Sequence, residues 1–221
     1  RTAYGTMGTG PVLLVAPGLI SHLEWWESAP GVTAFLSPIA EHRTIVLYDR
    51  HGCGLSDRDR SDFSAEDDMR DIEAVAQAIG PDPVDLFGTS WGALPIITFA
   101  ARHPRRVRRL VLYAAGGASG DDAISEGYRQ RRAAMAALRR ADLELYVRAV
   151  AVMFFPSSID HATLASFVRI HHMAATVDMQ ERLDSVSFQY EALLPLIDAP
   201  TLVLHRRGDL ACPFASGQQL A

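Results

Sequence analysis

The sequence predicts an α/β protein with a mostly parallel, doubly wound sheet flanked by helices and with a helical insertion late in the chain. Short runs of branched apolar residues alternate with segments of helical periodicity through the first 115 residues. Most of these runs are too apolar for strands with one solvent-exposed face, as is typical of parallel strands covered on both sides. Strand signals then stop and resume only at residue 201. This alternation, interrupted once, indicates an α/β core with an inserted helical segment.

Five strands and two helices follow from the local patterns. The predicted strands are residues 12–16, 44–49, 84–88, 107–115 and 201–205. The clearest helix begins after Ser64, which fits an N-cap with Asp67 three residues later, and ends at Gly80 and Pro81. A further helix is predicted over residues 91–103.

The insertion sets the expected domain organisation. From about residue 121 to residue 196 the chain shows only helical spacing, with an interruption at "FFPSS". We therefore expect residues 1–117 to form the first part of the core, 118–196 a helical cap, and 197–221 the rest of the core. A segment inserted there would lie over the ends of the strands that flank it.

Composition narrows the classes of function. The formal net charge is −5, which argues against a surface for nucleic acid or anionic membranes. The chain has no lysine, so lysine Schiff-base chemistry is excluded. Two arginine-rich stretches, residues 105–109 and 129–140, are interpreted as solvated faces because acidic and apolar residues are interspersed with them. A small-molecule partner fits this balance best.

Cofactor and targeting motifs are not found in the sequence. Cys53 and Cys212 are far apart and form no CxxC pattern, so neither a disulfide framework nor a zinc site is indicated. No nucleotide-binding glycine motif, Walker A motif, signal peptide or membrane-spanning run occurs. We expect a cytoplasmic protein with reduced thiols that needs no metal and no cofactor.

A serine between two glycines marks the candidate nucleophile. In "DLFGTSWGALPIITF", Ser90 lies between Gly88 and Gly92 where an apolar run passes into a helical one. This pattern places the serine in a tight, strained turn at the carboxyl edge of the sheet, with the helix N-terminus directed at any oxyanion. The alternative is a structural glycine turn.

The loop after the first predicted strand is a candidate for the oxyanion hole. In "LLVAPGLISHLEWW", a turn follows the strand, and such a loop beside the serine supplies a second backbone N–H group. The candidate donors are the amides of Leu19 and Trp91. An ordinary β-turn explains this segment equally well.

Two other strand ends carry polar residues. In "APTLVLHRRGDLACP", Asp209 follows the last predicted strand, where a carboxylate orients a catalytic histidine; a plain surface aspartate is the alternative. In "YDRHGCGLSDR", Asp49 and Arg50 are interpreted as turn-stabilising rather than catalytic, and His51 as a loop residue.

Five segments occur in the order and approximate spacing that are typical of one family: "PGLISH", "YDRHGCGLSD", "GTSWG", "ARHPRRVRRLVLY" and "PTLVLHRRGD". The chain resembles the α/β-hydrolase superfamily over nearly its whole length. It looks most like bacterial hydrolase-like domains found with adenylate or guanylate cyclases or with LuxR-type regulators, and its "GTSWG" is also similar to proline iminopeptidases. The resemblance implies Ser90 as nucleophile, Asp209 as acid, and the Leu19 and Trp91 amides as oxyanion hole.

The resemblance also implies a chemistry and a pocket. Members that are haloalkane dehalogenases or epoxide hydrolases carry aspartate where this chain has serine, so hydrolysis of an ester, lactone or related acyl bond is the leading reaction. The residues expected to line the acyl pocket are Gly18, His22, Trp25, Phe154 and Phe155. Aromatic residues at such spacing also occur in ordinary cores.

The catalytic histidine is not identified. Family members place it beyond the acid, but none of the twelve residues after Asp209 is histidine, and none of the eight histidines of the chain is assigned as the base. We expect the chain to be truncated before a histidine encoded downstream. Two alternatives stay open: a histidine supplied from elsewhere, or a silent ligand-binding sensor with an attached output domain. A homodimer is also left open.

Overall fold

The computed structural model describes residues 1–60, 63–115, 126–155 and 159–221. Its centre is a six-stranded sheet in the order β1-β3-β2-β4-β5-β6. The strands are β1 (Tyr4–Met7), β2 (Val12–Ala16), β3 (Thr44–Tyr48), β4 (Val84–Thr89), β5 (Val107–Tyr113) and β6 (Thr201–Leu204). β1 is antiparallel to β3, and all other pairs are parallel. The predicted parallel sheet is confirmed, with β1 as an additional edge strand.

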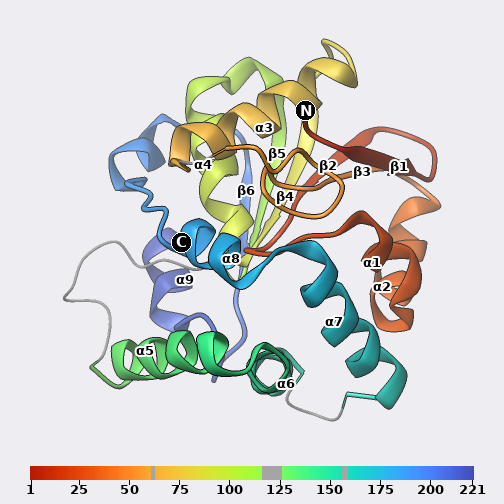
Figure 1. Cartoon of the computed structure of the whole chain (residues 1–221). Coiled ribbons are helices and arrows are strands. Elements are labelled where there is room, and N and C mark those ends of the chain that lie inside the picture. The colour runs from red at the N-terminus through yellow and green to blue at the C-terminus, as the bar shows by residue number, and fades with distance from the viewer. Residues whose placement is uncertain (61–62, 116–125, 156–158) are drawn as a thin grey trace.

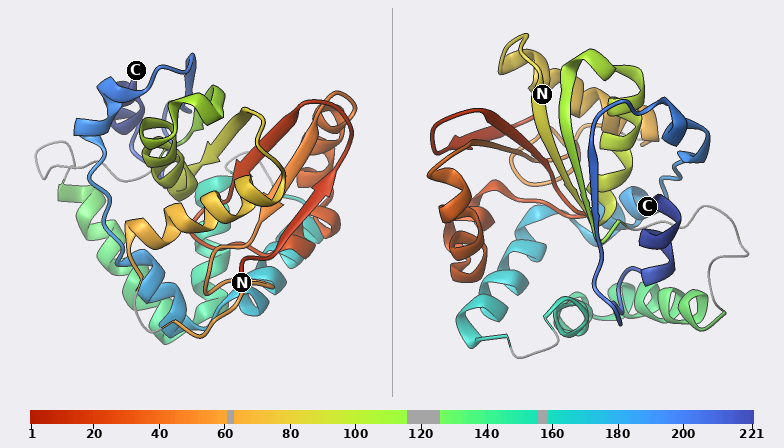
Figure 2. Two further views of the ribbon diagram at one scale, coloured as in Figure 1. Left: turned by 90° about the horizontal axis from the view of Figure 1, so that it is seen from above. Right: turned by 180° about the vertical axis from the view of Figure 1, so that it is seen from behind.

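Helices cover both faces of the sheet, as a doubly wound fold requires. α1 (Leu23–Ser28) and α2 (Pro30–Ala40) lie on one face, and α3 (Ala65–Ala78) and α4 (Ala93–Arg102) lie on the other (Figure 2). A short helix, α9 (Phe214–Leu220), follows the last strand.

The two apolar cores follow the alternation of side chains along the strands. Leu14 and Val46 are fully buried on the α3 and α4 side, whereas Val15 and Ile45 are buried on the α1 and α2 side. The expectation of burial on both faces is wrong for β5 and β6, where half of the large apolar side chain of Leu202 is exposed. Arg108 and Arg109 on β5 are exposed as well.

The predicted helix after Ser64 is confirmed with its cap. The Ser64 hydroxyl oxygen accepts a hydrogen bond from the Asp67 amide at 3.2 Å, and this helix is α3. The helix expected over residues 91–103 is shorter, because it opens with a 3₁₀ turn at Ser90–Gly92 and continues as α4. Three strands end one or two residues before their predicted ends at residues 49, 115 and 205.

Between β5 and β6 the described residues form helices, with a 3₁₀ turn at Glu191–Leu196, and no strand. We call α5 (Glu126–Ala141), α6 (Leu143–Phe154), α7 (His161–Ala174) and α8 (Val177–Asp184) the cap helices. They lie across one end of the sheet (Figure 1). The expected start of the cap at residue 118, and residues 156–158 of the "FFPSS" interruption, lie outside the described residues.

The cap helices are joined to the loop that follows β3. The Gly54 amide donates to the Ala174 carbonyl at 2.9 Å, and Arg58 donates to the Met173 carbonyl at 3.0 Å. The C-terminal end of α7 is thereby attached to the core through backbone carbonyls.

Acid should loosen the cap through His171. Burial lowers the pKa of His171 to about 4, from an ordinary value of 6.5, and its Nδ1 donates to the Phe167 carbonyl at 2.8 Å. Because the folded pKa lies below the unfolded one, this stabilisation is present above pH 6.5 and is lost as the pH falls toward 4. In urea unfolding at pH 7 and pH 5, we expect His171→Gln to lose less stability on acidification than the unmodified protein. His161→Gln, at the exposed start of α7, is the control and should behave like the unmodified protein.

Candidate active site

Ser90 occupies the turn between β4 and α4 in a conformation that L residues rarely adopt. Its φ is +53°, and among the described non-glycine residues only Ala114 also has a positive φ. Such a conformation costs free energy and persists where the surrounding structure imposes it. Here it is imposed by the abrupt passage from strand to helix, as the sequence motif predicts.

Two glycines make that passage sterically possible. A side-chain carbon at Gly92 would collide with the carbonyl oxygens of Ala16 and Pro17, and one at Gly88 would lie 2.7 Å from the Cα of Ala93. The turn therefore packs directly against the C-terminal end of β2. This close approach brings the loop after β2 to the nucleophile, since a carbon built on Gly18 would lie 4.0 Å from the Ser90 Cβ.

The close approach predicts that Gly92→Ala is strongly disruptive. The added methyl group meets backbone atoms, which cannot rotate away, so we expect a loss of about 1–3 kcal/mol of unfolding free energy together with loss of activity. Gly127→Ala in α5 is the matched control, because nothing lies within 4 Å of the added carbon. Urea denaturation of both variants tests this. Equal stability of the two variants would contradict the crowded turn.

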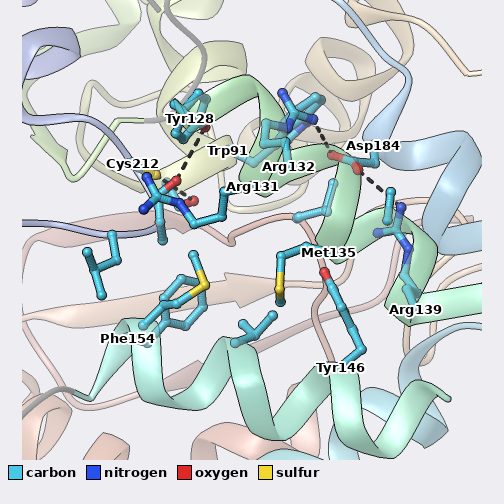
Figure 3. Close-up of a pocket in the computed structure, with 17 residues that line it drawn as sticks. Trp91, Tyr128, Arg131, Arg132, Met135, Arg139, Tyr146, Phe154, Asp184 and Cys212 are labelled. Carbon is cyan, nitrogen blue, oxygen red and sulfur yellow. Dashed lines mark hydrogen bonds and ion pairs between the residues drawn. The ribbon is translucent and has the colours of Figure 1, made fainter. Parts of the chain in front are cut away.

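A pocket of about 170 Å³ opens beside Ser90 (Figure 3). Leu19 and Trp91, the two predicted oxyanion donors, line it together with Ser90. The remaining lining residues come from the cap helices and from the loop after β6: Tyr128, Arg131, Arg132, Met135, Ala136, Arg139, Tyr146, Val150, Met153, Phe154, Asp184, Leu210, Ala211 and Cys212. Of the aromatic residues expected in the pocket, Phe154 lies there.

Three other expected pocket residues lie elsewhere. Trp25 and Phe155 pack against Phe167 in an apolar cluster formed by α1, α6 and α7, because ring–ring packing is satisfied there. His22 is buried as the N-cap of α1, and its Nδ1 accepts a hydrogen bond from the Glu24 amide at 3.2 Å. None of the three is among the described residues that line this pocket.

Asp209 shapes the loop that borders the nucleophile. Its Oδ1 accepts hydrogen bonds from the amides of Ala211 and Cys212 at 2.8 and 2.9 Å. This turn brings the Cys212 Sγ to 3.7 Å from the Ser90 Oγ. Burial raises the pKa of the Cys212 thiol to about 11, so the thiol is neutral beside the serine near pH 7. The sequence does not predict that Cys212 lies beside Ser90, because the two residues belong to no common motif.

No histidine is among the described residues that line this pocket. His205 directly follows β6, and its Nε2 donates to the Cys212 carbonyl at 3.0 Å, so it supports the loop of Asp209 rather than reaching Ser90. The described structure brings together the proposed nucleophile and both proposed oxyanion residues. Asp209 lies in the loop that borders them.

A buried ion pair joins the two predicted oxyanion residues. Arg50 donates to both carboxylate oxygens of Asp68, at 3.0 and 2.7 Å, and to the Leu19 carbonyl at 2.8 Å. The Trp91 indole donates to the same carboxylate at 3.5 Å, and the Arg50 guanidinium lies 5.6 Å from its ring centroid. Arg50 thus does more than stabilise its own turn: it positions Leu19 and Trp91 relative to one another.

Asp49 is turn-stabilising, as predicted. Its Oδ2 accepts from the amides of Leu23 and Leu55 at 3.2 and 2.9 Å. His51 is a buried loop residue whose amide donates to Asp71 at 2.8 Å. These contacts hold the loop after β3 against α1 and α3.

The interpretation of residues 129–140 as a solvated face is wrong for the side of α5 that faces the pocket. Arg139 is only 3% exposed, and Arg131 and Arg132 line the cavity. Tyr128, Arg132, Met135 and Arg139 are spaced four, three and four residues apart, so they share one side of a helix. This spacing could have predicted that the four residues face the same pocket. The many charged residues of the segment led instead to the prediction of a solvated face.

The described residues show neither a metal-binding cluster nor a membrane-spanning helix. No group of three or more histidine, cysteine, aspartate or glutamate side chains gathers there in a way that suits a metal ion. No helix in that part of the chain is long and apolar enough to cross a bilayer.

Comparison with known proteins agrees with this geometry. A family model described as alpha/beta hydrolase fold matches residues 11–216. The putative carbamate hydrolase RutD of Serratia proteamaculans is 27% identical over 96% of this chain and 78% of its own length. The 2-hydroxymuconate semialdehyde hydrolase of a Pseudomonas species is 29% identical over 100% of this chain and 78% of its own length.

Solved structures show the same fold. An esterase from Exiguobacterium antarcticum superimposes with a TM-score of 0.85 at 18% identity, over 99% of this chain and 82% of the esterase. The enol-lactonase of Burkholderia xenovorans gives 0.71 at 22% identity, over 100% of this chain and 83% of the lactonase. With its strained serine turn, its mostly parallel sheet and a family match over most of its length, the chain belongs to the alpha/beta hydrolase fold family.

Proposed function

We propose that this protein is a serine hydrolase that cleaves an ester, lactone or related acyl bond of a small molecule. The observation that carries the proposal is Ser90, which lies in a strained turn at the mouth of a pocket and beside two residues suited to hold an oxyanion. The hydrolase names of the aligned relatives support the same class of reaction.

In the proposed mechanism the Ser90 Oγ attacks the acyl carbon, and the leaving alkoxide takes the serine proton through a histidine. The Leu19 and Trp91 amides hold the oxyanion, and Asp209 orients the histidine. A water molecule then gives a proton to the histidine and attacks the acyl-enzyme. The histidine returns the proton to the Ser90 Oγ as the carboxylic acid is released. No histidine of this sequence is assigned as the base, and the cap helices are proposed to exclude water from the pocket.

Two further functions remain as proposals. A proline iminopeptidase-like activity is motivated by the tryptophan that follows Ser90. A ligand-binding sensor that regulates an attached domain is motivated by the resemblance of the chain to hydrolase-like domains found with cyclases or LuxR-type regulators. Both use the same pocket and differ from the first proposal in the bond that is cleaved, or in cleaving none.

The test is an intact-mass spectrum of the complete protein before and after reaction with a fluorophosphonate, followed by rates on p-nitrophenyl butyrate, γ-butyrolactone and proline p-nitroanilide. A single adduct and turnover of the ester or lactone are expected. Turnover of the anilide alone would favour the peptidase. A protein without adduct and without turnover would favour the sensor.

A further inference from the structure

We propose that the pocket binds a substrate that carries a carboxylate in addition to the bond that is cleaved, and that Arg131 pairs with this carboxylate. The inference rests on the proposed function, because it assigns the substrate class of the same pocket. Three features of the pocket wall carry it: an excess of positive charge, an unsatisfied donor, and apolar side chains that line the same cavity.

The pocket has more positive than negative groups in its wall. Arg131, Arg132 and Arg139 all come from α5, whereas Asp184 is the only carboxylate among the described lining residues. Asp184 accepts from Arg132 at 2.9 Å and from Arg139 at 3.1 Å, so its charge is already shared by two guanidinium groups (Figure 3). The charge of Arg131 is left without a counterpart among the described residues that line the pocket.

Arg131 has an unsatisfied donor. Its Nε is buried and has no hydrogen-bond partner among the described residues, and none of the ion pairs formed by these residues includes Arg131. Its guanidinium lies 5.8 Å from the centroid of the Tyr128 ring, a contact that leaves the donor edge unused. Because Arg131 also lines the pocket, a ligand there can supply the acceptor that its guanidinium lacks among the described residues.

A large part of the remaining wall is apolar. Met135, Val150, Met153, Phe154 and Leu210 line the cavity together with the charged residues. Such walls lower the local dielectric constant and strengthen an ion pair formed in the pocket. A planar guanidinium matches a carboxylate through two parallel hydrogen bonds. A small substrate with an apolar body and one carboxylate therefore satisfies both parts of the wall.

The first experiment compares matched esters on the complete protein. One pair is mono-p-nitrophenyl adipate and its methyl ester, in which the charge is on the acyl side. The other is 4-(butyryloxy)benzoate and its methyl ester, in which the charge is on the leaving-group side. We expect kcat/KM to be about tenfold or more higher for the charged member of one pair, which corresponds to about 1.4 kcal/mol. Preference for the neutral member in both pairs would overturn the proposal.

The variant Arg131→Gln should reduce the charged-to-neutral ratio of kcat/KM to near one. Arg140→Gln is the matched control, because Arg140 lies on the same helix, pairs with Glu181 at 2.5 Å and is not among the lining residues. It should keep the ratio of the unmodified protein. Circular dichroism of both variants confirms that α5 remains folded. An unchanged ratio in Arg131→Gln would contradict the assignment.

Binding without turnover separates this inference from the proposed hydrolysis. Calorimetric titration of Ser90→Ala with monomethyl adipate, hexyl phosphate and dimethyl adipate should show binding of the carboxylate, weakened about tenfold by Arg131→Gln. If this holds while no ester is hydrolysed, the hydrolase proposal fails and the anion site stands. Tighter binding of hexyl phosphate, or equal binding of dimethyl adipate, would overturn the carboxylate assignment.

Discussion

Ser90→Ala is expected to lose about four to six orders of magnitude in kcat for the ester or lactone that the complete protein hydrolyses. The alanine has no oxygen to form the acyl-enzyme, and water attacks without the covalent intermediate that divides the reaction into two easier steps. The same variant should give no fluorophosphonate adduct. Initial rates and intact mass measure both effects.

Ser37→Ala is the control for that result. Ser37 is an exposed residue of α2 whose hydroxyl donates to the Thr33 carbonyl at 2.8 Å, far from the pocket wall. It should keep both the rate and the adduct. Retention of the full hydrolytic rate in Ser90→Ala would refute the assignment of Ser90 as the nucleophile. A fluorophosphonate adduct that persists in this variant would show that the reactive serine is another residue.

Asp68→Ala is expected to have the largest effect on stability, a loss of about 3–5 kcal/mol of unfolding free energy. The substitution leaves the Arg50 guanidinium buried without its carboxylate, since both side chains of this pair are less than one-tenth exposed. It also removes the acceptor of the Trp91 indole and loosens the contact of Arg50 with Leu19. We therefore expect kcat to fall as well. Urea denaturation and initial rates measure the two effects.

The control lies two residues away on the same helix. Glu66 pairs with Arg102 at 2.8 Å, but both side chains are nearly half exposed, so Glu66→Ala should cost less than about 1 kcal/mol. The double variant Arg50→Met with Asp68→Leu removes both charges and should recover stability without recovering the rate. A loss in Asp68→Ala no larger than that in Glu66→Ala would contradict the proposed importance of the buried pair.

Much of the fold and part of the site were predictable because they depend on local patterns. Apolar runs alternating with helical periodicity identify the parallel strands, and the Ser64 cap and the glycines around Ser90 fix the turns. Edge strand β1 was not predicted. It is short and half-exposed, so its sequence has neither an apolar run nor a regular alternation strong enough to distinguish it from a loop.

The remaining contacts join residues that are distant in the sequence. Cys212 meets Ser90 across 122 positions, and Asp184 reaches Arg139 across 45, so no local pattern signals either pair. Trp25 and Phe155 share the aromatic composition of a pocket wall, but packing directs both toward Phe167.

The sequence by itself determined the fold class, the strained turn at Ser90 and the loop that carries Asp209, because each is specified by the conformational preferences of a few neighbouring residues. Only the tertiary structure decided which face of α5 is buried and which arginines enter the pocket. Burial and charge pairing depend on which helix packs over which strand end. The arginines of an amphipathic helix can lie on a solvent-exposed face or line a pocket, and only that packing decides between the two.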